Sequence, residues 1–391
     1  MNKHKKTRVV IVGGGFGGVK VALELSKDRK FDITLISSST SFDYHGALYR
    51  TATGNTPLEV VIPLREIFAR TKNITVVLDT ITGIKSLSNA VKGADGEIYE
   101  YDVLILALGN QINYFGLKDM EEKSFAANTI PHTIALRHEL ITKFKTGKRL
   151  TIAVVGGGPS GVELAGSLDM FARRVAKKYG KKYMQPHVLL IEGGPRLLPV
   201  LAPVLSEKVA QHLKKLGVEL LLSTAVSSCT RGKLHLNGGI QNADIIIWTA
   251  GSRIADFYTD KEKEFAFERG RVVVDEYLRA KGHQNIYVIG DNAGTKYSGM
   301  AQTALRDAKY VAESLSRIAH GRKAKKYTPR RPVYAVPAGE SWAVYQSTRH
   351  QLSGYAAWLL RRRADLYIYK NFEPYAKAVK RWRHANRQAD F

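Results

Sequence analysis

Cysteine is almost absent from this sequence of 391 residues, which contains only Cys229. A single cysteine can form neither an internal disulfide nor a dithiol redox centre. The sequence therefore excludes enzymes that pass electrons through a pair of thiols within the chain. We expect Cys229 to be a buried bystander.

Long apolar runs are missing as well. No run reaches the roughly 18 residues that a membrane-spanning helix requires. Residues 1–6 are basic but lack the apolar stretch of a secretion signal, so we expect a short solvated tail there. We also expect no metal site.

Acidic residues are scarce, because 35 Asp and Glu stand against 60 Lys and Arg, which gives a formal net charge of +25. This charge predicts attraction to a polyanion, either nucleic acid or an anionic lipid surface. The length suits about two or three domains, and the hydrophobic content of 44% can fill their cores.

A glycine-rich turn follows the first apolar run, Val9–Val12, and precedes residues with helical spacing. In such a strand–turn–helix, Gly13 allows the tight turn, Gly15 lets backbone amides approach a phosphate, and Gly18 lets helix and strand pack closely. Anionic oxygens are favoured at the helix N-terminus, where unpaired N–H groups lie. The turn predicts a dinucleotide site, although glycine-rich turns also serve packing alone.

The same arrangement returns at Gly156, Gly158 and Gly161. The next apolar strand, residues 187–191, ends at Glu192, whose carboxylate can accept both ribose hydroxyls of an adenosine and repels a 2′-phosphate. This pattern predicts an NADH site, the alternative for Glu192 being a solvated strand-end acid. The first site lacks the acid, since its strand ends in Ser37-Ser38-Ser39.

Two dinucleotide sites in one chain imply a bound flavin that takes hydride from a nicotinamide. The sequence here resembles the two-dinucleotide-binding-domain flavoproteins. Residues 101–109 resemble their strand ending in A-T-G, with Leu108 in place of Thr, and residues 284–291 resemble their late Gly-Asp strand. With no cysteine before Cys229, the cysteine-dependent branches are excluded: flavin disulfide reductases, sulfide:quinone oxidoreductases, and single-cysteine NADH oxidases and peroxidases.

Local motifs resemble the type II NADH dehydrogenases. The resemblance runs from about residue 9 to residue 312 and includes residues 42–54, where His45-Gly46 replace a frequent Thr-Pro. Further matching segments are residues 62–68, 113–116, 161–166, 193–199 and 247–251.

The resemblance implies which residues hold the two cofactors, FAD and NADH. For FAD they are Gly13, Gly15, Phe16, Gly18, Ser37, Ser38, Arg65, Ile81, Ala107, Gly109, Asp291, Gln302 and Ala304. For NADH they are Gly156, Gly158, Ser160, Gly161, Glu163, Glu192, Ala250 and Gly251.

Residues 301–308 resemble the family's quinone motif A-Q-x-A-x-Q. Gln302 fits the motif, but Arg306 stands where the second glutamine belongs, which leaves the identity of the acceptor open. An ordinary helix start beside the flavin is the alternative. We interpret Glu163 and Gln302 as the catalytic candidates at the junction of nicotinamide and quinone.

The predicted fold class is α/β, with two Rossmann-like domains, the NADH domain nested within the FAD domain, and an amphipathic helical extension. The expected boundaries are 1–114 and 271–326 for the FAD domain, 115–270 for the NADH domain, and 327–391 for a C-terminal region that associates with a membrane.

In that last region a basic segment, residues 319–332, contains prolines that oppose a helix. Beyond it, apolar residues fall into two helical stripes beginning at Leu352 and Phe372, and Arg361-Arg362-Arg363 are expected on the basic face opposite. An apolar stripe opposite a basic face is typical of helices that lie in a bilayer interface. The alternative interpretation is that these helices pack on the protein's own core.

The sequence thus predicts an enzyme that transfers hydride from NADH to FAD and then electrons to a membrane quinone without pumping protons. We expect it on the cytoplasmic face of the cell membrane, as a peripheral protein bound to anionic lipid. We expect no nucleic-acid partner, because no binding module for one is recognisable. A homodimer is left open. The alternatives are a soluble NADH-dependent flavin reductase serving an iron–sulfur protein or oxygen, and a basic nucleotide-sensing protein without turnover.

Overall fold

The computed structural model describes residues 6–230 and 232–384, so most of the predicted basic tail and the last residues of the C-terminal region lie outside it. The chain forms two compact units, each built from three segments. Unit 1 comprises Met1–Asp43, Val61–Gln111 and Ser252–Pro332, and unit 2 comprises Tyr44–Val60, Ile112–Gly251 and Val333–Phe391.

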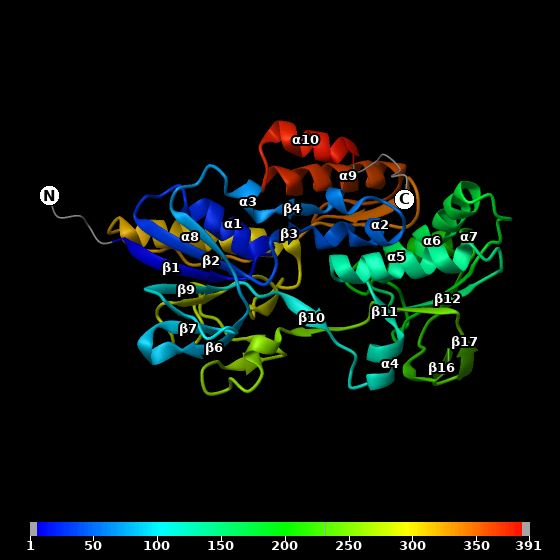
Figure 1. The fold of residues 1–391 in the computed structure, drawn as a ribbon, viewed down its shortest axis with the longest axis horizontal. Coiled ribbons are helices and arrows are strands. Elements are labelled where there is room, and N and C mark those ends of the chain that lie inside the picture. The colour runs from blue at the N-terminus through cyan, green and yellow to red at the C-terminus, as the bar shows by residue number, and fades with distance from the viewer. Residues whose placement is uncertain (1–5, 231, 385–391) are drawn as a thin grey trace. The chain divides into compact units, whose positions relative to one another are not determined.

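Unit 1 contains a parallel sheet in the order β22-β9-β1-β2-β5, of which Figure 1 labels β9, β1 and β2. The apolar residues of the first run are buried in its central strand, as a parallel sheet covered on both faces requires. The strands are β1 (Thr7–Val12), β2 (Phe31–Ser37), β5 (Ile74–Leu78), β9 (Val103–Leu106) and β22 (Ile286–Val288).

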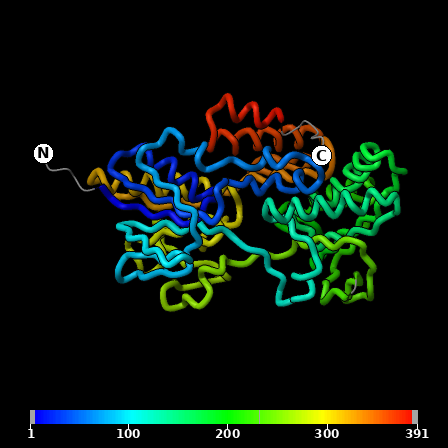
Figure 2. The backbone as a smooth tube through the Cα atoms, in the orientation of Figure 1, coloured from blue at the N-terminus to red at the C-terminus, as the bar shows by residue number. Residues whose placement is uncertain are grey.

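Two helices of unit 1 that are far apart in sequence pack against each other, α1 (Phe16–Leu25) and α8 (Ala301–Ala319) (Figure 2). Smaller elements complete the unit. They are β3 (Ser41–Asp43) with β4 (Val61–Pro63), α3 (Leu64–Ile67), the antiparallel sheet β6 (Ile81–Lys85), β7 (Ala90–Gly93) and β8 (Ile98–Glu100), β10 (Asn110–Ile112) with β19 (Ser252–Ile254), and β20 (Phe267–Glu268) with β21 (Arg271–Val272).

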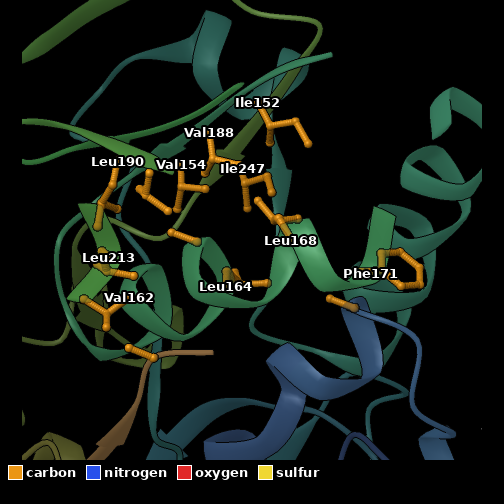
Figure 3. Close-up of a cluster of buried hydrophobic side chains, with 14 of the residues drawn as sticks. Ile152, Val154, Val162, Leu164, Leu168, Phe171, Val188, Leu190, Leu213 and Ile247 are labelled. Atoms are coloured by element: carbon orange, nitrogen blue, oxygen red, sulfur yellow. The ribbon is translucent and has the colours of Figure 1, made fainter. Parts of the chain in front are cut away.

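Unit 2 repeats the architecture with a parallel sheet in the order β11-β18-β12-β13-β14. Figure 3 shows its core, where Val154 and Leu190 of the sheet lie near Leu164 and Leu168 of α6. The strands are β11 (Phe125–Ala126), β12 (Thr151–Val155), β13 (His187–Ile191), β14 (Val218–Leu221) and β18 (Ile245–Trp248). The helices are α2 (Leu48–Ala52), α4 (Lys118–Lys123), α5 (Ile130–Phe144), α6 (Pro159–Lys178) and α7 (Pro203–Lys215).

The end of the chain belongs to unit 2 and starts with an antiparallel sheet, β23 (Tyr334–Pro337), β24 (Ala343–Gln346) and β25 (Gln351–Gly354). Two helices follow, α9 (Tyr355–Lys370) and α10 (Tyr375–His384). The prediction for Leu352 was wrong, because this residue lies in β25 and starts no helical stripe. The guanidinium of Arg362 lies between the rings of Trp358 and Trp382, at 5.1 and 4.6 Å, which fixes α10 on α9.

The predicted fold class is confirmed: two parallel sheets with helices on their faces, the second inserted into the first, and a helical extension. Cys229 is buried in β15 (Val226–Thr230), which pairs with β16 (Lys233–Leu236) and β17 (Gly239–Asn242). Within residues 6–230 and 232–384, no helix has the length and apolar character to cross a bilayer.

Candidate functional site

The first glycine turn joins β1 to α1 by a close approach of backbone to backbone. Gly13 has a φ of +117°, and its N–H donates to the carbonyl oxygen of Ile36 at 2.8 Å. A Cβ built on Gly18 would lie 1.8 Å from the carbonyl oxygen of Gly13, so no larger residue fits there. Gly13 and Gly18 are therefore required by the fold itself.

Gly15 is not required in that way. It has an ordinary φ of −87°, and a Cβ built on it would meet no described atom within 4 Å. It is the N-cap of α1, which has no side-chain cap among the described residues. A helix N-terminus that is left uncapped beside an unobstructed glycine fits a phosphate approaching the backbone amides.

The second turn repeats these features in unit 2. Gly156 has a φ of +113° and donates to Ile191 O at 2.7 Å, and a Cβ on Gly161 would lie 1.8 Å from Gly156 O. Gly158 caps α6, and a Cβ built on it, like one on Gly15, would meet no described atom within 4 Å. Ala250 of the predicted site is also near, because a Cβ on Gly156 would lie 2.8 Å from its nitrogen.

The two turns differ in the residue that follows the second strand. Glu192 accepts hydrogen bonds from the N–H groups of Gly157 and Gly194, both at 2.6 Å. Ser37 occupies the equivalent place in unit 1, since a Cβ on Gly14 would lie 2.3 Å from its Oγ. Only the second turn therefore carries a negative charge where a ribose is expected.

The other predicted FAD residues gather mostly at the same edge of the unit 1 sheet, because the carboxyl ends of parallel strands meet there. Ala107 and Gly109 follow β9, and Asp291 follows β22. Ala304 lies in the first turn of α8, two residues after Gln302. It is next to Gly290, because a Cβ built on Gly290 would lie 3.3 Å from the Cβ of Ala304. Ser38 follows β2, and Ile81 shares an apolar cluster with Val12. Arg65 lies on α3 next to Leu64, whose side chain is near Gly14 of the first turn.

Asn292 is a residue at this edge that the sequence did not single out. It is fully buried, and its Nδ2 donates to the carbonyl oxygen of Gly109 at 2.7 Å. Its Oδ1 is also buried but has no hydrogen-bond partner among the described residues. A buried acceptor without a donor is costly, so Asn292 fits a ligand that brings one.

Glu163 lies on α6 in the interior of unit 2, near two arginines. Burial raises the pKa of this carboxyl to about 8, although Arg361 and Arg50 act in the opposite direction. Burial therefore favours the neutral, protonated form of the Glu163 carboxyl.

Those arginines belong to a buried network between α9 and residues 44–50. The Asp365 carboxylate accepts from Tyr44 Oη at 2.6 Å and from Arg50 Nη1 at 3.1 Å, and it also pairs with Arg361. Arg361 Nη2 donates in addition to the carbonyl oxygen of Gly46 at 2.5 Å. Burial opposes ionisation of Asp365, but the two arginines and the hydrogen bonds hold its pKa below the usual range.

This network corrects the expectation for Arg361. The sequence placed it on an exposed basic face, whereas it is only 7% exposed and is paired inside the protein. The missed signal was Asp365 at the i+4 position, which lets a helix pair the two side chains on one buried face.

We predict that replacing Asp365 by Asn lowers the free energy of unfolding by about 3–5 kcal/mol, because two arginines then stay buried without their counter-charge. Urea unfolding at neutral pH measures this change. The control is Glu313→Gln, which breaks an exposed pair with Lys309 and should cost at most about 0.5 kcal/mol. Equal effects of the two variants would contradict the interpretation.

We also predict that NADH is preferred over NADPH by a few kcal/mol in kcat/KM. Each lost ribose hydrogen bond to a carboxylate costs about 1.5–3 kcal/mol, and the 2′-phosphate is repelled as well. Glu192→Ser, which copies the residue of the first turn, should narrow the preference. Glu219→Ser on the neighbouring β14 is the control and should leave the ratio unchanged; equal use of both nucleotides by the unaltered protein would refute the assignment.

The chain is similar to known proteins in both sequence and fold. The sequence model of the family described as pyridine nucleotide-disulphide oxidoreductase matches residues 7–308. A type II NADH:quinone oxidoreductase of Mycobacterium tuberculosis is 30% identical over 386 residues, which span 91% of this chain and 83% of the relative. One from Staphylococcus haemolyticus is 28% identical over 349 residues, or 82% and 85% of the two chains.

Among solved structures, NDH2 from Plasmodium falciparum in complex with NADH is similar, with a TM-score of 0.86 over 97% of both chains and 17% identity. At that identity the likeness concerns the fold. Together with the family match along residues 7–308 and the relatives that align over most of the chain, it shows that this chain belongs to the pyridine nucleotide-disulphide oxidoreductases, and among them to the type II NADH:quinone oxidoreductases.

Proposed function

We propose that this protein oxidises NADH with a bound FAD and passes the electrons to a membrane quinone, without pumping protons. The observation that carries the proposal is the pair of glycine turns on two parallel sheets, of which only the second has a carboxylate, Glu192, at the ribose position. FAD, when bound, supplies the group that accepts hydride and transfers the electrons to the acceptor. The chain supplies position and electrostatics.

In unit 1, the N-terminus of α1 at Gly15 holds the FAD pyrophosphate. Asn292 Oδ1 and the residues predicted from the sequence surround the rest of the cofactor. We keep the predicted set as a proposal: Gly13, Gly15, Phe16, Gly18, Ser37, Ser38, Arg65, Ile81, Ala107, Gly109, Asp291, Gln302 and Ala304. The proposed FAD domain, residues 1–114 and 271–326, contains all of them.

In unit 2, the N-terminus of α6 holds the pyrophosphate of NADH, and Glu192 orients the adenosine ribose. Gly156, Gly158, Ser160, Gly161, Glu163, Ala250 and Gly251 line the nucleotide, within a proposed NADH domain of residues 115–270. Glu163 also has a proposed catalytic role. Burial favours the protonated form of its carboxyl, and we keep Glu163 as a catalytic candidate because quinone reduction by NADH consumes one proton besides the hydride.

The acceptor distinguishes this proposal from a soluble flavin reductase. Gln302 lies in the first turn of α8 beside the predicted FAD residues, which suits a contact with the quinone. We predict that Gln302→Leu slows quinone reduction about tenfold or more and leaves flavin reduction by NADH intact in single turnover of the FAD-loaded protein, because the proposed hydrogen bond from Gln302 to the quinone is not needed for hydride transfer to the flavin.

Stopped-flow bleaching of the flavin and steady-state assays with quinone, ferredoxin and oxygen measure the two halves. Gln211→Leu on the exposed face of α7 is the matched control. If Gln302→Leu impairs both halves equally, Gln302 is structural. If ferredoxin or oxygen outcompetes every quinone with the unaltered protein, the soluble alternative replaces the proposal.

The exposed side of α9 and α10 favours a lipid-soluble acceptor. Tyr355, Leu359, Tyr367 and Tyr375 are each between 44% and 63% exposed, although they are aromatic or aliphatic. Exposed basic residues lie on the same two helices: Arg363, Lys370, Lys377, Lys380 and Arg383. We call these nine residues the docking surface. A helix that lies on an anionic bilayer places its aromatic rings at the interface, and its lysines and arginines reach the lipid phosphates.

We propose that the docking surface binds the cytoplasmic face of the cell membrane, as part of the C-terminal region 327–391. Deleting the helices would not test this cleanly, because it would also remove Asp365 and Arg361 from the buried network. Substitutions on the exposed side leave that network in place.

We predict that Tyr355→Ser combined with Leu359→Ser and Tyr367→Ser releases the protein from anionic vesicles and depresses activity with long-chain quinone but not with short soluble quinone. Each basic residue near such a surface contributes on the order of 1 kcal/mol, so salt should weaken the binding, while the apolar part is insensitive to salt. Sedimentation with phosphatidylglycerol vesicles measures it. Leu87→Ser, at a fully exposed position in unit 1, is the control. An unaltered protein that ignores these vesicles at low salt would rule the surface out.

A further inference from the structure

The basic segment between α8 and β23 is held along α8. It has no regular secondary structure, as its prolines predicted. We call residues 323–331 the strap. Arg317 Nε donates to Lys323 O at 2.8 Å, and Tyr310 Oη donates to Lys325 O at 2.7 Å.

Arg306 holds the far end of the strap. Its Nη1 donates to the carbonyl oxygens of Arg330 and Arg331, at 2.8 and 3.3 Å. The residue that replaces the second glutamine of the quinone motif thus has a described contact with the chain's own backbone. The strap is fastened to α8 by hydrogen bonds at both ends and in its middle.

Asp307 joins the strap to a second element. It is completely buried, and its two oxygens serve different partners. Oδ1 accepts from Tyr327 Oη of the strap at 2.5 Å, and Oδ2 accepts from the N–H of Gly290 at 3.0 Å. Burial raises the pKa of Asp307 to about 6, so at neutral pH it is an ionised acceptor for both donors. Hydrogen bonds to a buried carboxylate are among the stronger ones.

Gly290 starts the turn that carries Asp291 and Asn292. Its φ is +72°, and a Cβ there would lie 3.3 Å from that of Ala304. The turn is therefore held from two directions, by Asn292 Nδ2 on Gly109 O and by Asp307 on Gly290 N–H. Its position decides where Asp291 and Asn292 Oδ1 stand relative to the cofactor.

We propose that Asp307 is a positioning residue that holds the Gly290–Asn292 turn for FAD and couples FAD binding to the seating of the strap on α8. The inference rests on the proposed FAD site in unit 1. Since one carboxylate bonds both elements, releasing Tyr327 of the strap from Asp307 frees the turn, and by thermodynamic linkage bound FAD holds Tyr327 on Asp307.

The experiment measures how fast FAD leaves the purified holoenzyme after dilution, from the rise in free flavin fluorescence. Tyr327→Phe removes only the strap's hydrogen bond to Asp307, yet it should speed FAD release about fivefold or more if the two elements are coupled. Asp307→Asn should speed it about tenfold or more. The double variant should be no faster than Asp307→Asn alone, because both changes act through the same carboxylate.

Arg317→Gln is the matched control, since it loosens the strap at Lys323 but leaves the bond to Asp307 intact. Trypsin should cut the strap faster in this variant, with FAD release within about twofold of the unaltered protein. If Tyr327→Phe loosens the strap to trypsin while FAD leaves at the normal rate, the coupling does not exist. Additive effects of the two changes would overturn it as well. A preparation that never carries FAD would instead refute the proposed function.

Discussion

The close approach of a helix to the strand before it is the constraint on which both halves of this protein depend. At Gly18 and Gly161 a Cβ would overlap the carbonyl oxygen of the turn's first glycine, so only glycine lets the helix begin where it does. That placement aims the helix N-terminus at the edge where the carboxyl ends of the parallel strands meet. The phosphate site, the strand-end residue and the later turns all take their positions from it.

The two turns are nearly identical in backbone geometry and differ in charge. Ser37 and Glu192 occupy equivalent positions, yet only the carboxylate can repel a 2′-phosphate and bind two ribose hydroxyls. A cofactor that stays bound is held by many contacts. A nucleotide that is selected at each turnover needs a contact that distinguishes NADH from NADPH. The neutral turn therefore suits the resident cofactor, and the charged turn suits the nucleotide that comes and goes.

The C-terminal helices combine two environments. The inner face of α9 supplies Arg361 and Asp365 to a buried network that would be costly to break, whereas its outer face carries exposed tyrosines, an arginine and a lysine. A surface that docks on lipid needs such a rigid support, because mobile helices would lose conformational entropy on binding. The network also places α9 close to Glu163, so the helix that faces outward also helps to determine the charge around a buried carboxyl of α6.

The sequence alone determined the two glycine turns, the strand-end acid and the nested α/β fold, because these rest on local rules: glycine spacing, apolar runs and strand-to-helix order. It also predicted that the segment after α8 is not helical. It did not reveal that Arg361 is buried, that Asn292 has a buried oxygen with no partner in the described part of the chain, or that Asp307 bonds two elements. Those facts depend on which residues meet from distant segments: Tyr44 and Asp365, or Gly290 and Asp307, come together only when the sheets and helices pack. A charged residue on an amphipathic helix looks the same in sequence whether it faces water or a buried partner, and only the tertiary structure decides between the two.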